Sequence, residues 1–429
     1  MYTRGSALLS KEINRIITDK NATLGAFFKT PFSKIIEKLF ANNEQGFFYD
    51  LNDLSMMYQD AAGTVPVTGS GQPVGLMLDK SKGAVIGVNT ANPTTVIGSG
   101  TGGAAFKTTT VSTTHTVGKW YEVSMQVSNF SGTSDVGFTN ASFSDTPILS
   151  RTISGNGIIS FKGRATEASI RVYMRSANNA DFSNISIKEI TGNHAFQTTS
   201  ASRPILRRNA VTGTYYLEFD GSDDFLQTNN IDFTVTDKVS LFAGVRKLSD
   251  ATQAVLVELS SSWSVSAGTF AIFAPPYNGG AGYTSASRLS VADIANQQAV
   301  ITTGYPSPVS SVVTSLFSTD TKLRVDGKLK ITNTANKGTG NYGNYPLYIG
   351  RRAGTTIPFN GHIYSLIGIG RLSTGSEIAA IEKELAKQIQ KIADNYMYDS
   401  KILAIIKSND ELENIAKNEI DGVIYKNLI

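Results

Sequence analysis

The sequence predicts a mainly β protein, with two β-sandwiches flanked by N- and C-terminal helices. Three observations support this prediction. Runs of residues in the middle of the chain alternate between apolar and polar side chains, as half-buried antiparallel strands do. Gly, Ser, Thr and Asn fill the stretches between those runs, as in the loops of all-β domains. Charged residues are sparse in this middle region and gather at the two ends, where apolar residues recur with a helical period.

The charge distribution divides the 429 residues into three zones. Charged residues make up 17% of the chain, below the roughly 25% of a typical soluble domain. Residues 1–46 contain seven Lys/Arg and four Asp/Glu, and residues 371–429 contain eight and ten. The 324 residues between them hold only 45 charges. We therefore expect the sandwiches in the middle zone, and the chain length allows two or three domains of roughly 150 residues each.

Two stretches of the middle zone carry the clearest strand signal. Apolar and polar side chains alternate in Trp120–Val127 and again in Ile170–Arg175. A period of two gives each strand one buried face and one wet face. Further along, the pair Asp326-Gly327 predicts a tight hairpin, because these residue types adopt the positive φ angles of a primed turn.

Both ends of the chain predict helices. In the N-terminal zone, isoleucines recur at helical spacing in Ser10–Lys20, and a second apolar stripe follows Pro31. Towards the C-terminus, Thr374 opens a capping-box pattern, and an apolar stripe continues from there to Ile392. A second helical region follows at Lys401–Leu428. We expect the helix after Thr374 to pack on its own sandwich and the outermost segments to serve assembly with other chains.

Composition excludes several classes of site and partner. The chain has no cysteine, which excludes disulfide scaffolds, thiolate zinc sites and thiol nucleophiles. A net charge of +4 is too small to indicate a nucleic-acid partner. The start of the chain lacks the apolar core of a signal peptide, and no apolar run approaches the roughly 20 residues of a membrane span. We therefore expect a chain that is made in a cytoplasm and is not inserted in a membrane.

Two separated stretches carry a specific pattern. The first, Leu51–Gly83, ends in VPVTGSGQPVGLMLDKSKG. The second begins with GNHAFQTTSASRP at Gly192 and continues into YYLEFDGSDDFLQT at Tyr215–Thr228. Three later segments extend it, namely TDKVSLFAGVRKLSDA, GTGNYGNYPLYIGRR and FNGHIYSLIGIGR. This order resembles a family of tailed-bacteriophage and prophage virion proteins, and the resemblance covers about Phe47–Ile392.

The resemblance implies how the chain divides into domains. Residues 47–83 plus 192–392 are similar to a discontinuous concanavalin-A-like or laminin-G-like sandwich. The intervening residues 84–191 resemble a jelly roll of the carbohydrate-binding-module type, through the strands GKWYEVSMQV and DFSNISIKEI. Residues 1–46 are then a helical attachment or oligomerisation segment, and residues 393–429 are a helical C-terminal tail.

Asp220, Asp223 and Asp224 cluster on one turn and are the candidate metal ligands. Calcium, a hard cation that takes several oxygen ligands, is the ion that they would suit. The alternative, which we favour, is a plain hairpin turn, because Asp-Gly-Ser-Asp is common turn chemistry. With Glu218, the same carboxylates could form a glycosidase pair, but a catalytic acid needs a desolvated carboxyl and we expect this turn to be solvated. No other cofactor is predicted.

Six aromatic residues are candidates for contact with a saccharide, since Tyr and Trp combine an apolar ring with a polar tip. They lie in Gly/Asn-rich loops or at strand starts: Trp120, Trp263, Tyr277, Tyr283, Tyr342 and Tyr345. The alternative for each is packing within a sandwich or between subunits. No catalytic residue is predicted, because His115, His194 and His362 are far apart and neither a nucleophile elbow nor a phosphate loop is present.

The resemblance and the helical ends lead to one leading hypothesis. It is a non-catalytic structural protein of a tailed-phage virion, such as a tail fibre, appendage or capsid-surface component. The chain would assemble through its ends as a homo-oligomer, with a trimer favoured, beside other virion proteins. Its sandwich loops would contact a host cell-surface glycan or a neighbouring virion subunit. The alternatives are a polysaccharide depolymerase of a phage tail and a capsid decoration or head-fibre protein without glycan binding.

Overall fold

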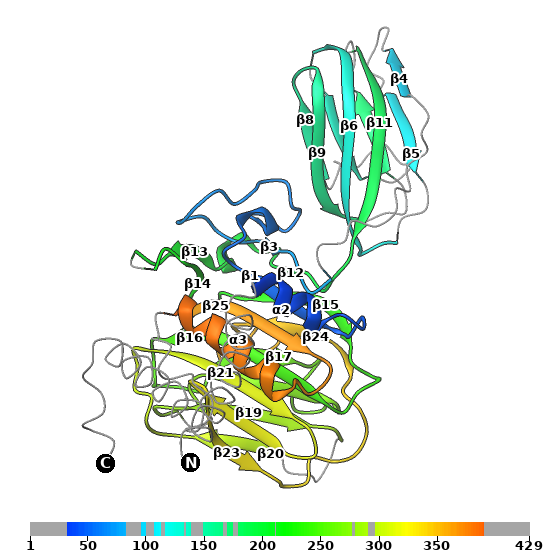
Figure 1. Ribbon diagram of the computed structural model, residues 1–429. Coiled ribbons are helices and arrows are strands. Elements are labelled where there is room, and N and C mark those ends of the chain that lie inside the picture. Colours follow the sequence, from blue (N-terminus) through cyan, green and yellow to red (C-terminus); the bar gives the residue numbers. More distant parts are fainter. Residues whose placement is uncertain are drawn as a thin grey trace, which may run out of the picture.

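The computed structural model of the chain is mainly β and consists of two antiparallel sandwiches (Figure 1). The structure describes residues 32–82, 96–99, 107–112, 116–132, 134–138, 149–165, 170–174, 179–210, 212–276, 279–290 and 297–389. The large sandwich carries the two helices of this part of the chain, and the small one is inserted into its sequence. The fold class predicted from the sequence is confirmed.

Eight strands form the first sheet of the large sandwich. Their order is β13-β14-β25-β16-β21-β22-β23, and β1 pairs with β25 outside this path. Asp326 and Gly327, with φ angles of 53° and 75°, join β22 to β23 and confirm the predicted hairpin. The bounds of the strands are β1 (Gly46–Asp50), β13 (Ile205–Arg208), β14 (Tyr215–Asp220), β16 (Val239–Lys247), β21 (Val309–Phe317), β22 (Thr321–Val325), β23 (Lys328–Asn333) and β25 (Asn360–Ile369).

Nine strands form the facing sheet, in the order β2-β3-β12-β15-β24-β17-β18-β19-β20. Apolar side chains of the two sheets meet in one buried core, in which Phe270 of β18 stacks on Phe317 of β21 with ring centroids 5.8 Å apart. The bounds are β2 (Met57–Tyr58), β3 (Leu76–Met77), β12 (Ala195–Phe196), β15 (Leu226–Asp232), β17 (Val255–Leu259), β18 (Thr269–Phe273), β19 (Tyr283–Arg288), β20 (Gln297–Ile301) and β24 (Asn344–Ile349).

The small sandwich consists of two four-stranded sheets, in the orders β5-β10-β7-β8 and β4-β11-β6-β9. Its strands all fall within the predicted insertion at 84–191. The predicted alternation is confirmed in β6, where Val123, Met125 and Val127 are buried and the residues between them are half-buried. The bounds are β4 (Val96–Ser99), β5 (Lys107–Ser112), β6 (Trp120–Ser131), β7 (Ser134–Phe138), β8 (Leu149–Ile153), β9 (Gly157–Arg164), β10 (Ile170–Met174) and β11 (Asn179–Ile190).

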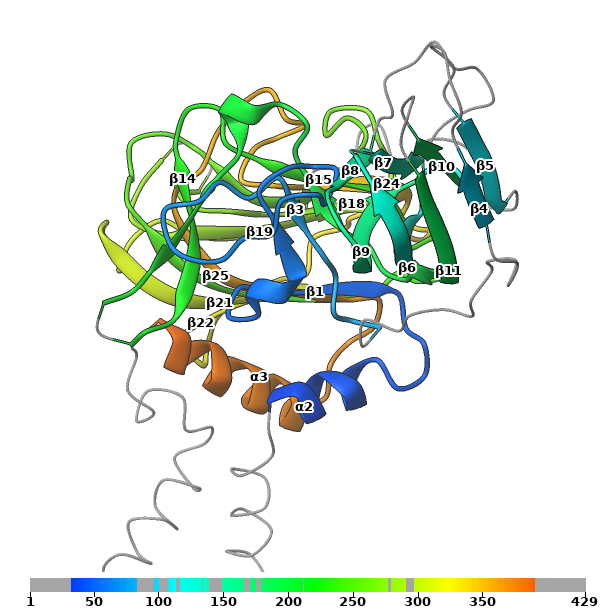
Figure 2. The same ribbon diagram turned by 90° about the horizontal axis from the view of Figure 1, so that it is seen from above.

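Two helices, α2 (Phe32–Leu39) and α3 (Gly375–Gln388), lie side by side on the outer face of the eight-stranded sheet (Figure 2). Helix α3 begins with the predicted capping box: the Thr374 side chain accepts from the Glu377 N–H, and the Glu377 carboxylate accepts from the Thr374 N–H. The packing predicted for this helix is confirmed, because its apolar stripe, including Ile381 and Leu385, is buried against the sheet. Short 3-10 helices occur at Leu54–Met56 and Ser200–Ser202.

The prediction that residues 1–46 form a separate attachment segment is wrong for the last part of that range. Ile36, Leu39 and Phe40 are buried in the same cluster as α3, and β1 begins at Gly46. Residues 1–31 and 390–429 lie outside the described residues, and with them the helices predicted in Ser10–Lys20 and after residue 400. Within the described part of the chain, no helix is long and apolar enough to cross a bilayer.

The two halves of the split sequence pattern meet where the chain leaves the large sandwich and returns to it. The buried Asp79 carboxylate accepts hydrogen bonds from the backbone N–H groups of Phe48, Ser81 and Asn193, at 2.8, 2.7 and 2.7 Å, and from the Ser81 hydroxyl at 2.9 Å. The Asp79 N–H donates to Nδ1 of His194 at 2.9 Å, and His194 Nε2 donates to the Ile190 carbonyl at 3.0 Å. These bonds connect the two ends of the insertion directly.

This arrangement keeps His194 neutral. Its Nδ1 must carry a lone pair to accept from Asp79, so the ring proton is on Nε2. Burial lowers the pKa of His194 to about 4. Protonation would therefore remove the Nδ1 acceptor and place an imidazolium in a dry site.

We predict that His194 contributes a loss of stability as the pH falls from 6.5 to 4. Over this range the unfolded chain takes up a proton at residue 194 and the folded chain does not, so His194 alone lowers the free energy of unfolding by up to roughly 3 kcal/mol. Denaturant unfolding at a series of pH values measures this loss. His194→Asn keeps an acceptor near the Asp79 N–H and cannot be protonated, so its stability should depend less on pH. An equal pH dependence in wild type and variant would contradict the assignment.

Candidate functional site

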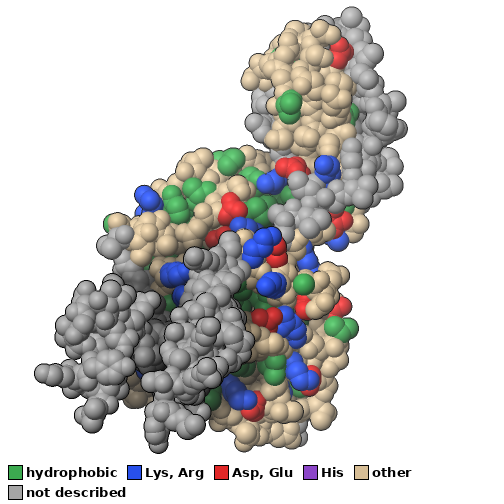
Figure 3. All heavy atoms as spheres, in the orientation of Figure 1, with side chains coloured by type: hydrophobic (Ala, Val, Ile, Leu, Met, Phe, Trp, Pro, Cys, Tyr) green, Lys and Arg blue, Asp and Glu red, His purple; other side chains and the backbone are tan. Residues whose placement is uncertain are grey.

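A cleft of about 1220 Å³ opens where the two sandwiches meet. Its walls come from α2, from strands β6, β9 and β11 of the small sandwich, and from β15 and β24 of the large one. Residues that represent these elements in the cleft are Glu37, Trp120, Arg164, Glu189, Asn229 and Asn344. Charged side chains gather around α2 and the junction on the face seen in Figure 3, whereas the small sandwich presents mostly uncharged surface there.

Arg164 fixes the two walls of the cleft relative to each other. Its Nη2 donates to Oδ1 of Asn229 in the large sandwich at 2.9 Å, and its Nε donates to the Gly118 carbonyl at 3.2 Å. The Asn229 amide donates in turn to the same Gly118 carbonyl at 3.1 Å. The guanidinium also lies 5.0 Å from the ring centroid of Phe196, within the range of a cation–π contact. Burial lowers the pKa of Arg164.

The floor of the cleft offers amide groups to a ligand. Asn229, Asn230 and Asn344 are exposed along the paired strands β15 and β24, and Asp232 lies beyond them. The Asn230 amide donates to the Asn344 carbonyl at 3.1 Å. Neutral groups that both donate and accept are the partners that sugar hydroxyls need.

Trp120 lines the cleft but is only 3% exposed. It packs with Leu76, Ile190 and Phe196 in the apolar cluster between the sandwiches, and its ring meets His194 edge-on at 6.1 Å. Its indole N–H is buried without a partner among the described residues. Trp120 therefore packs mainly between the two sandwiches, and little of its side chain is accessible from the cleft.

The other aromatic residues predicted to contact a saccharide differ in burial and in position. Tyr283 and Tyr342 are 0% and 1% exposed, so the prediction that they contact a saccharide is wrong: both rings belong to the main core. Tyr345 is half-buried and packs against that core, and Tyr277 lies outside the described residues. Trp263 is partly exposed in the loop between β17 and β18, outside the cleft.

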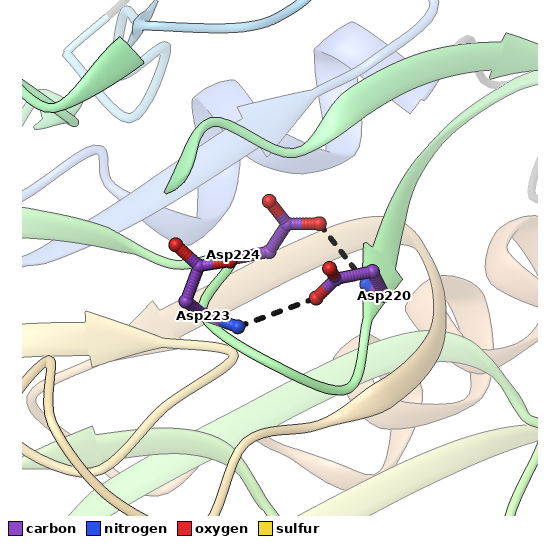
Figure 4. Close-up of side chains that lie close together, drawn as sticks. All are labelled: Asp220, Asp223 and Asp224. Atoms are coloured by element: carbon purple, nitrogen blue, oxygen red, sulfur yellow. Dashed lines mark hydrogen bonds between the residues drawn. The ribbon is translucent and has the colours of Figure 1, made fainter. Parts of the chain in front are cut away.

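The predicted acidic turn is closed by its own hydrogen bonds (Figure 4). Oδ2 of Asp224 accepts from the Asp220 N–H at 3.0 Å, and Oδ1 of Asp220 accepts from the Ser222 and Asp223 N–H groups at 2.7 and 3.3 Å. The Ser202 hydroxyl donates to Asp223 at 2.6 Å. Carboxylate oxygens of the three aspartates lie within 4.8 Å of one another, which is close enough for one cation, but one oxygen of each aspartate already accepts a hydrogen bond in or beside the turn.

The expectation that this turn is solvated is wrong for Asp224, which is 7% exposed. Burial raises the pKa of Asp224 to about 6, and the hydrogen bond from Asp220 acts in the opposite direction. Glu218, the other predicted carboxylate, forms an ion pair with Arg207 on the neighbouring strand. A desolvated carboxyl is therefore present, but it points into the turn, where it accepts a backbone hydrogen bond.

The two described histidines lie at different places in the large sandwich and its junction. His194 serves the junction, His362 of β25 stacks on Tyr216 with centroids 4.2 Å apart, and His115 lies outside the described residues. Burial lowers the pKa of His362 to about 4. Among the described residues, the acidic turn is the one cluster of His, Cys, Asp and Glu side chains compact enough for a metal ion.

Sequence reasoning missed the residues that shape the cleft. Arg164 and Asn229 are far apart in the chain, and neither stands in a motif. They become neighbours because the end of β9 in the small sandwich lies beside β15 of the large one. The family resemblance, which implied two sandwiches with one inserted in the other, was the one sequence feature that could have indicated their junction.

No protein-family model and no curated protein matches the chain. Solved structures with a similar arrangement of strands include the CBM40 of the Ruminococcus gnavus IT-sialidase bound to α2,3-sialyllactose, at 15% identity and a TM-score of 0.28, over 36% of this chain and 97% of that one. The binding domain of botulinum neurotoxin serotype D matches at 12% identity and a TM-score of 0.33, over 44% of this chain and 51% of that one. The class defined by the fold itself is a mainly β protein of two antiparallel sandwiches.

We predict that Asp224→Asn stabilises the protein at pH 8 by about 1 kcal/mol. The raised pKa means that ionising Asp224 costs folding free energy as the pH rises through about 6, and Asn avoids that cost while keeping an acceptor for the Asp220 N–H. Denaturant unfolding at pH 8 and at pH 4.5 measures the difference in unfolding free energy, which should be smaller at the lower pH.

Millimolar calcium in the same assay tests the metal interpretation of the turn. We expect calcium to leave the stability of wild type and variant unchanged, because the turn is complete without an ion. A calcium-dependent stabilisation of wild type that Asp224→Asn lacks would instead identify a binding site.

Proposed function

We propose that this chain is a non-catalytic structural protein of a tailed-phage particle, and that it contacts a host cell-surface saccharide through the cleft between its sandwiches. The observation that supports saccharide contact is the row of exposed amides, Asn229, Asn230 and Asn344, on the floor of that cleft. At about 1220 Å³, the cleft exceeds the usual range of roughly 300–1,000 Å³ for a small-molecule pocket. An extended ligand of several sugar units suits this size.

The chemistry of the cleft favours a polar, extended ligand over an apolar one. Lys119 pairs with Glu189 at its rim, and Thr116 contributes an exposed hydroxyl. Hydrogen bonds to uncharged hydroxyls contribute about 0.5–1.5 kcal/mol each, so affinity would come from several of them acting together. Moderate affinity of a single chain is adequate for a particle that carries many copies, since multivalency raises avidity.

The proposed place in a virion depends on the sequence pattern. The segments that resemble the phage family, LDKS and NHA, contain Asp79 and His194, which hold the insertion to the large sandwich. The two segments that carry the resemblance are therefore also the segments that join the small sandwich to the large one. Residues 1–31 and 390–429 are the segments through which we propose that the chain joins other copies and other virion proteins, as a trimer or another closed oligomer.

The proposal of a non-catalytic role rests on the geometry of the acidic turn. A polysaccharide depolymerase would need a proton donor facing its substrate. The carboxyl with a raised pKa, Asp224, instead accepts a backbone hydrogen bond inside the turn. A capsid decoration protein without glycan binding is the remaining alternative, and the binding experiment below separates it from our proposal.

We predict that Asn230→Ala combined with Asn344→Ala weakens glycan binding about tenfold, because two hydrogen-bonding amides are lost while the fold is kept. A glycan array with the purified full chain identifies the saccharide, and calorimetry with that saccharide compares the variants. Thr303→Ala, which removes an exposed polar group elsewhere on the large sandwich, serves as the matched control. An array without any bound glycan, or equal affinities for all three proteins, would contradict binding in the cleft.

The proposed location is tested separately. Mass spectrometry of purified particles from the source phage or induced prophage should find the chain at a fixed copy number relative to the major capsid protein. Its absence from intact particles would contradict the virion role and leave the binding result standing.

A further inference from the structure

Two arginines and a tryptophan meet on the outer face of the nine-stranded sheet, away from the cleft. Side chains alternate along β17, β18 and β19, so one set enters the main core and the other faces outward. The outward set includes Ala271, Phe273 and Ala286, which form a small apolar cluster separate from the core. Trp263 covers this cluster from the loop after β17 and meets Phe273 edge-on at 5.8 Å.

Arg288 and Arg352 both contact the ring of Trp263. The guanidinium carbon of Arg288 lies 5.7 Å from the ring centroid, and that of Arg352 lies 5.1 Å from it. Arg288 ends β19, where it pairs with Thr269 of β18, and Arg352 comes from the loop after β24. Three elements that are distant in sequence therefore bring two positive charges to one aromatic ring.

The positive charge at this place is only partly neutralised. Nε of Arg352 donates to Oε2 of Glu258 at 2.7 Å, and the Glu258 side chain is fully buried. Arg288 is 8% exposed, yet its Nε and Nη2 have no acceptor among the described residues, and neither has Nη2 of Arg352. Among the described residues, Glu258 thus neutralises Arg352, and no acidic side chain forms an ion pair with Arg288.

An unpaired buried guanidinium is costly, because it has left water without gaining the hydrogen bonds that would replace it. Burial lowers the pKa of Arg288, and the nearby charge of Arg352 lowers it further. The hydroxyls of Thr269 and Thr284, on the same outward set, are also buried without a partner in the described part of the chain. Several donors therefore converge on one side of the sheet and lack acceptors.

We propose that Arg288, Arg352 and Trp263 form a second binding site, for a sugar unit that carries a carboxylate. A carboxylate offers the two acceptor oxygens that a guanidinium fork matches. The partly exposed Trp263 ring offers an apolar surface to the C–H face of a pyranose. The two features together select an acidic sugar over a neutral sugar, which lacks the charge, and over a small carboxylate, which lacks the ring.

Calorimetry with the full chain tests this selection directly. Glucuronate and galacturonate are the probes, and glucose, galactose and acetate are the matched compounds that lack either the carboxylate or the ring. We expect the two acidic sugars to bind about tenfold more tightly than the other three, because a hydrogen bond to a charged group contributes more than one between neutral groups. Equal affinity for glucose would overturn the role of the arginines, and equal affinity for acetate would overturn the role of Trp263.

Arg288→Met separates a binding role from a structural one. It removes an unpaired buried charge and keeps most of the volume, so the variant should melt at a higher temperature than wild type and bind glucuronate about tenfold more weakly. Arg208→Met, at an exposed arginine on β13, is the control and should change neither property. A lower melting temperature of Arg288→Met, or unchanged glucuronate binding, would overturn the proposal.

Two further measurements keep the test independent of folding and of the cleft. Arg288→Lys retains the charge and loses the fork, so it should fold and still bind glucuronate more weakly than wild type does. The pair Asn230→Ala and Asn344→Ala should leave glucuronate binding unchanged, because the cleft is a separate site. Binding that depends on those asparagines instead of Arg288 would overturn the second site while supporting the first.

Discussion

The rest of the structure depends on the carboxylate of Asp79. It is buried, and it is held by four hydrogen bonds from three separate segments: the strand that begins the large sandwich, the exit to the insertion and the return from it. Its own N–H fixes His194, and that ring reaches back to the last strand of the insertion. These bonds hold the small sandwich of about a hundred residues to the large one. The hydrogen bond from Arg164 to Asn229 is a second contact between them, and the two contacts together fix the orientation that forms the cleft.

Much of the fold could be predicted because its signals are local. Alternation within β6, the Asp326-Gly327 turn and the capping box of Thr374 each require only a few neighbouring residues. The nesting of one sandwich in the other could be inferred only from the resemblance. The packing of α2 on the large sandwich was missed because a short amphipathic helix has the same pattern whether it covers its own sheet or another subunit.

The sites could be predicted less well, because burial is a property of tertiary neighbours. Tyr283 and Tyr342 stand in Gly-rich sequence, yet their rings fill the core, and Asp224 is buried in a turn whose composition indicates exposure. Trp263 was identified from its residue type, but its partners Arg288 and Arg352 follow it by 25 and 89 positions and belong to different strands or loops. No spacing in the sequence marks such a convergence.

The most direct test of the account is the distance between the two sandwiches in solution. The chain has no cysteine, so spin labels can be placed at Ile158→Cys and Val235→Cys, whose native side chains are 78% and 82% exposed, one on each sandwich. Double electron–electron resonance should give one narrow distance distribution, which Asp79→Asn broadens. A distribution that is already broad with Asp79 in place would contradict the claim that the junction holds the two sandwiches as one body around the cleft.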